Sequence, residues 1–168
     1  MTLGLSVAAI TLIHVIISLI AIVTGLVAMV GLLKSRPMPG WTGIFLLTTI
    51  LTSATGFMFP VDKLLPSHVI GIVSLVLLAI ACLALYGRKL AGHWRWIYVV
   101  TAMTSLYLNI FVLVIQSFLK VPVLHALAPS VPPAEPPFAI MQGIVLVLFV
   151  AVTFLAVRKF RPLGAGLA

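Results

Sequence analysis

Long apolar runs alternate with short polar breaks along the whole chain. Five uncharged runs, at about residues 5–33, 41–59, 67–87, 96–119 and 138–157, approach or exceed the roughly 20 residues that a helix needs to cross a bilayer. The breaks contain proline, glycine or charged residues, which are typical of loops. This pattern predicts an all-α integral membrane helical bundle with five transmembrane helices, forming a single domain over residues 1–168.

Composition supports this prediction and argues against a soluble, nucleic-acid-binding fold. Hydrophobic residues make up 63% of the chain and charged residues 7%, and the mean hydropathy is +1.34. A soluble fold of 168 residues cannot bury that much apolar surface, so the expected partner is the lipid bilayer. A net charge of +8 would suggest nucleic acid in a soluble protein, but here the cations stand in short clusters between apolar runs. We therefore expect no nucleic-acid partner.

The distribution of lysine and arginine predicts the orientation of the helices. With the N-terminus outside, the outer cations are Lys63 and Lys120, and both acidic residues, Asp62 and Glu135, also lie outside. The eight inner cations are Lys34, Arg36, Arg88, Lys89, Arg95, Arg158, Lys159 and Arg161. Cytoplasmic segments of membrane proteins carry such an excess of positive charge. The sequence thus predicts a multipass protein of a bacterial inner membrane, N-terminus out and C-terminus in.

The same His-Val-Ile tripeptide opens two of the apolar runs, at His14 and at His68. A cation follows twenty residues later in both, at Lys34 and at Arg88. This shared register predicts a tandem helical-hairpin repeat that pairs residues 14–59 with residues 68–118. Twenty helical residues span about 30 Å, the thickness of the hydrocarbon layer. Both histidines should therefore lie near the outer membrane interface.

Polar side chains on the later helices favour either helix packing or a ligand site. One face of the run 96–119 is polar, and its members recur at helical spacings: Thr101, Ser105, Asn109, Gln116 and Lys120. In the first interpretation such groups hydrogen-bond between helices and do no chemistry. In the second they form a pocket for a quinone or another lipid-like apolar ligand, oriented by Asn109, Gln116, Gln142 and Tyr107.

The histidines supply the most specific hypothesis about chemistry. His14 and His68 lie at matching depth on helices of the same direction, which is what two axial ligands of one b-type haem require. A second hypothesis is a copper or zinc site that adds His125 from the outer proline-rich loop 120–137 to the same pair. In that case the loop would act as a lid; otherwise it only connects two helices.

Catalysis of the kinds found in soluble enzymes has no support in the sequence. The chain lacks a Ser-His-Asp set, paired carboxylates and a phosphate-binding glycine loop. We therefore expect either a redox-linked membrane protein that uses the histidine pair or a non-catalytic one. Transport has little support in the sequence and would require a homo-oligomer, because five helices alone offer little room for a pathway.

The segment Gly92-His93-Trp94-Arg95-Trp96, following two helices that begin with histidine, resembles a known group of proteins. The group consists of small bacterial multipass predicted membrane proteins of unknown function, and the resemblance covers about residues 14–119. More loosely, this layout is similar to four-helix cytochrome b assemblies. That resemblance implies haem between helices, and because only one outer histidine pair is present, it implies a single haem.

Overall fold

The computed structural model of the chain describes residues 6–59 and 66–162, and the regular elements in these ranges are all helices. They are α1 (Val7–Leu33), α2 (Pro39–Gly56), α3 (Pro66–Cys82), α4 (Trp94–Lys120), α5 (Pro122–Leu127) and α6 (Pro136–Lys159). Helix α3 continues directly into a π-helical turn, η1 (Leu83–Gly87). The predicted all-α class is confirmed.

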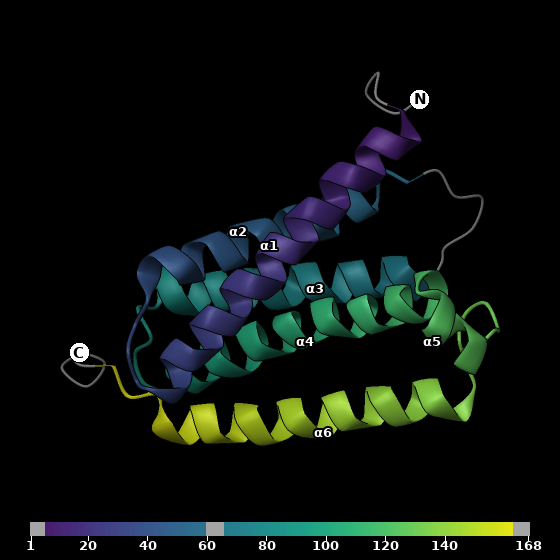
Figure 1. Cartoon of the computed structure of the whole chain (residues 1–168). Helices are drawn as coiled ribbons and strands as arrows, with labels where there is room; N and C mark the ends of the chain where they lie inside the picture. Colours follow the sequence, from purple (N-terminus) through teal and green to yellow (C-terminus); the bar gives the residue numbers. More distant parts are fainter. Residues whose placement is uncertain (1–5, 60–65, 163–168) are drawn as a thin grey trace.

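Helix α4 is the centre of the bundle. It packs against α1, α2, α3 and α6, and its residues Val99, Met103 and Leu106 are at most 2% exposed. Figure 1 shows α6 running alongside α4, while α1 crosses the other helices at an angle. The most extensive helix pair is α1 with α2. The short helix α5 lies at the end of the bundle where α4 finishes and α6 begins (Figure 1).

Four helical segments, rather than the predicted five, are long and apolar enough to cross a membrane by length and composition. They are α1, residues His68–Gly87, α4 and α6, and they make this chain a multipass membrane protein. The segment that falls short is α2, which was expected over residues 41–59 but ends at Gly56 after 18 residues. Hydroxyl-bearing side chains lower its hydropathy: Thr42, Thr48, Thr49, Thr52, Ser53 and Thr55.

Proline begins helices in this protein where the sequence pattern predicted loops. Pro39, Pro122 and Pro136 each stand at the first helical positions of α2, α5 and α6. The missing N–H of proline costs nothing there, because the first N–H groups of a helix have no partner within it. Two predictions are corrected for this reason: α6 begins at Pro136 rather than at 138, and part of the expected loop 120–137 is the helix α5.

Candidate functional site

Helix α2 buries hydroxyl groups beside Phe45 and Leu46, and its outward side is apolar. Trp41, Leu47 and Leu51 are between 41% and 58% exposed, whereas Thr49 is fully buried and Ser53 nearly so. A helix on the surface of a soluble protein has the opposite arrangement. The candidate polar site predicted from the sequence therefore lies around the inner face of α2.

Two of the four polar side chains predicted to orient a ligand, Asn109 and Gln142, instead join helices. The Asn109 side-chain amide on α4 donates a hydrogen bond to the Thr49 hydroxyl on α2 at 3.2 Å. The Gln142 side-chain amide on α6 donates to the Phe111 carbonyl on α4 at 3.0 Å. Bonds of this kind between membrane helices contribute about 0.6 to 2 kcal/mol each. For Asn109 and Gln142 the geometry thus favours the helix-packing interpretation.

His14 also joins two helices. Its Nδ1 lies 2.8 Å from the Thr55 hydroxyl oxygen on α2, and the Phe59 ring stands edge-on to the imidazole at 5.4 Å. The Thr55 hydroxyl donates its hydrogen to the Leu51 carbonyl at 2.8 Å, so in the His14 pair it accepts from Nδ1–H. In the neutral imidazole this leaves the lone pair on Nε2. Nε2 is therefore the atom of His14 that could bind a metal ion or accept a proton.

His68 lies on the other side of the end of α2. Its ring packs on Phe57 at a centroid distance of 5.6 Å, and a Cβ built on Gly71 of the same helix would lie 3.1 Å from Phe57 Cζ. Thr55 and Phe57 are two residues apart, which places them about 200° apart around the axis. The last turn of α2 thus separates the side chain that His14 contacts from the one that His68 contacts.

This separation bears on the haem hypothesis. Two axial imidazoles must point at one iron from opposite faces of a porphyrin. His14 and His68 would meet that requirement only if the end of α2, with Phe57, moved from between them. A shared haem stays a prediction, which visible absorption spectra of the purified protein and of its His14→Ala and His68→Ala variants test.

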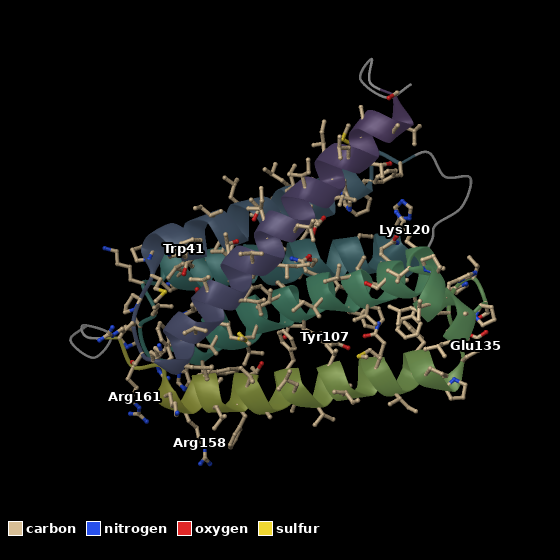
Figure 2. The ribbon with its side chains drawn as sticks, in the orientation of Figure 1. Trp41, Tyr107, Lys120, Glu135, Arg158 and Arg161 are labelled. Atoms are coloured by element: carbon tan, nitrogen blue, oxygen red, sulfur yellow. The ribbon has the colours of Figure 1, made fainter. Side chains whose placement is uncertain are left out.

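The remaining predicted residues lie apart from this region. Gln116 is exposed on α4, and Tyr107 lies between α4 and α6 (Figure 2), with its ring 5.8 Å from that of Phe149. His125 is on α5, where its Nδ1 is buried and has no hydrogen-bond partner among the described residues. Within residues 6–59 and 66–162, no three His, Cys, Asp or Glu side chains lie close enough together to hold a metal ion.

A groove between α1, α4 and α6 is a feature that sequence reasoning missed. It has a volume of about 250 Å³. Its lining is entirely hydrocarbon or thioether: Leu26, Met29, Ile110, Val145, Leu148, Phe149 and Val152. Nothing in the sequence distinguishes these residues from other apolar positions, because the groove arises from how α1 packs against α4 and α6.

The eight cations predicted to lie inside share one end of the bundle. The Arg88 guanidinium stands over the Trp94 ring at 5.3 Å, and the Arg95 guanidinium donates to the carbonyls of Val157 and Phe160. The Arg161 backbone N–H donates to the Ser35 hydroxyl at 2.7 Å. These contacts bring together the end of α1, the turn between η1 and α4, and the end of α6. Figure 2 shows Trp41, Arg158 and Arg161 at this end, which we call the cationic end.

Lys120 and Glu135 lie at the opposite end (Figure 2), whereas Asp62 and Lys63 fall outside the described residues. Glu135 organises the turn before α6, because its carboxylate accepts hydrogen bonds from the backbone N–H groups of Ser130 and Ala134 and from the Ser130 hydroxyl. Desolvation would raise the pKa of the Glu135 carboxyl, but these hydrogen bonds outweigh it and lower the pKa below its ordinary value. Glu135 therefore stays ionised as a turn-forming residue.

No protein-family model matches the sequence, and neither a curated protein nor a solved structure is found to be similar to it. The resemblance to small bacterial multipass proteins, noted at residues 92–96, therefore stays a prediction. The site has to be interpreted from its own chemistry.

Proposed function

We propose that this membrane protein binds a lipid-like apolar molecule in the groove between α1, α4 and α6. The observation that carries the proposal is the groove itself, about 250 Å³ in volume and lined only by apolar side chains. Spaces between the helices of a bundle are common ligand sites. This lining offers a polar ligand nothing to replace its hydrogen bonds to water, which makes burial of such a ligand costly. A hydrocarbon chain suits the groove best.

The walls of the groove support this choice. On one side Phe149 is 7% exposed, and it packs against Tyr107, whose ring in turn lies 6.0 Å from that of Phe111. This aromatic row fixes the wall between α4 and α6. On the other side Met29 of α1 has an unbranched, flexible side chain that can adjust to chains of different shape.

We also propose that the chain crosses a bacterial inner membrane five times, with its N-terminus outside and its cationic end in the cytoplasm. Two observations support the fifth crossing. Helix α1 and the α3–η1 segment both finish at the cationic end, so α2 must return the chain between them. The outward face of α2 is apolar, as contact with lipid requires. The excess of cations at one end supports the orientation.

Cysteine labelling in whole cells tests this orientation. In a Cys82→Ala background, Ala134→Cys places a thiol at the exposed turn before α6, and Lys89→Cys places one at the cationic end. We expect a membrane-impermeant maleimide to label the Ala134→Cys variant in intact cells and the Lys89→Cys variant only after lysis. The reverse pattern would show the opposite orientation, and labelling of both in intact cells would argue against five crossings.

Cross-linking with a photoactivatable phosphatidylcholine in nanodiscs tests the groove. We expect adducts on the α1 segment around Leu26 and Met29, and a loss of those adducts in a Val145→Trp variant, whose indole would fill the groove. A loss of about 1 kcal/mol of binding free energy corresponds to about a fivefold drop in adducts, which is the smallest effect we expect. Val147→Trp is the matched control, because Val147 is 69% exposed on the same helix. Equal adduct levels in both variants would refute the groove as a binding site.

A further inference from the structure

The groove opens beneath a junction of positive charge. At the cationic end α1 and α6 are tied together by the hydrogen bond from the Arg161 N–H to the Ser35 hydroxyl. Exposed cations flank this tie in the sequence, and we call them the junction cations: Lys34, Arg36, Lys159 and Arg161. Among the described residues the one acidic side chain, Glu135, lies at the other end of the bundle (Figure 2). The charge of the junction is therefore uncompensated by the protein around it.

The other cations at this end are held elsewhere. Arg95 is half-buried and donates to the last carbonyls of α6, and Arg88 stacks on Trp94 beside the turn between η1 and α4. Arg158 lies over the ring of Phe154, 4.4 Å from its centroid, and points away from α1 (Figure 2). The junction thus presents cations from the two helices that also form the groove.

The depth of the groove fits a lipid chain that starts at this junction. Val152 precedes Lys159 by seven residues and Val145 by fourteen, which places the groove about 10 to 21 Å below the cation along α6. Leu26 precedes Lys34 by eight residues, or about 12 Å along α1. Half of a bilayer's hydrocarbon layer is about 15 Å thick. The groove therefore lies mainly in one leaflet and reaches slightly past the bilayer midplane.

We propose that the groove selects an acidic phospholipid, with its headgroup among the junction cations and one acyl chain between α1, α4 and α6. This inference rests on the proposed function and adds the class of lipid to it. Phosphate oxygens of an anionic headgroup are good acceptors for lysine and arginine, singly or in pairs. The excess negative charge of the headgroup is what distinguishes such a lipid from a zwitterionic one at this junction.

Competition between two lipids tests the selectivity. The full-length protein is placed in nanodiscs that contain photoactivatable phosphatidylglycerol or phosphatidylcholine with identical acyl chains. At low salt we expect groove adducts on α1 and α6 to form about tenfold more with phosphatidylglycerol, and the ratio to fall as salt screens the charges. In an Arg36→Gln/Lys159→Gln variant the ratio should approach one, with the phosphatidylcholine adducts unchanged.

A matched double variant separates the junction from the general charge of this end. Arg88→Gln/Lys89→Gln removes the same charge from the turn between η1 and α4, and it should keep the preference for phosphatidylglycerol. An equal loss of preference in both double variants would overturn the junction site. Equal adduct formation by both lipids in the unaltered protein would also overturn the junction site. That result would leave the proposed groove as a lipid-binding site intact. If neither lipid forms groove adducts, the proposed function itself fails.

Discussion

Replacing Gly25 with valine should leave little folded protein. Gly25 lies where α1 crosses α2 and α4, and a Cβ atom there would stand 2.6 Å from Leu106 Cδ1 and 2.8 Å from Phe45 Cδ2. Both neighbours are almost completely buried, so neither can swing into free space. Overpacking of a dense core costs about 1 to 3 kcal/mol, and a branched side chain against two helices should reach the upper end of that range or exceed it. Size-exclusion chromatography and thermal unfolding in detergent measure the loss.

Gly143→Val provides the control for this prediction. A Cβ at Gly143 meets no heavy atom within 4 Å on the outward face of α6, and the substitution changes helix propensity in the same way. We expect the Gly143→Val variant to elute and unfold like the unaltered protein. A Gly25→Val variant with unchanged melting temperature would show that α1 does not cross α2 and α4 as closely as the structure describes.

The second large effect should come from Arg95→Gln. The Arg95 guanidinium donates to the Val157 carbonyl at 2.8 Å and to the Phe160 carbonyl at 2.6 Å, and it thereby satisfies carbonyls at the end of α6. Hydrogen bonds from a charged donor contribute about 1.5 to 3 kcal/mol each, and partial exposure of this pair lowers their sum. We expect the free energy of unfolding to fall by about 2 to 4 kcal/mol. Hydrogen exchange should become faster in the peptide 152–162.

Two further variants separate the hydrogen bonds of Arg95 from its charge. Lys89→Gln removes one positive charge from an exposed position at the same end, and we expect no change in unfolding or exchange. Arg95→Lys keeps the charge but loses the planar fork of donors, so its stability should fall between those of the other two. Equal stabilities for Arg95→Gln and Lys89→Gln would rule out the anchoring of α6 by this guanidinium.

The sequence could predict which end of the bundle each helix reaches, because the number of residues in a run determines the length of its helix. Twenty residues separate His14 from Lys34 and His68 from Arg88, and the structure does bring both cations to one end. The sequence also predicted that Asn109 lies on a polar face of α4, and its side chain does contact α2. These features depend on local geometry alone, and elementary helix parameters determine them.

The direction in which a side chain points around its helix axis could not be predicted, because it depends on which other helices pack beside that helix. His14 and His68 were placed at equal depth, yet the last turn of α2 separates their contacts. Gln116 shares a face with Asn109 but is exposed, since the helix that covers α4 at Asn109 does not cover it at Gln116. The groove likewise arises from the angle at which α1 approaches α4 and α6, and no residue pattern encodes that angle.

The inverted polarity of α2 has a consequence for how the protein is made. A segment with so many hydroxyl groups gains little from entering lipid alone, because a protein-conducting channel sorts each segment into the bilayer by its apolarity. Helix α1 is synthesised first, is 27 residues long, and packs against α2 more extensively than any other helix does. The two should therefore leave the channel together as a hairpin, in which His14 of α1 already contacts the Thr55 hydroxyl of α2. Packing against α1 would thus help α2 to enter the bilayer before the later helices are made.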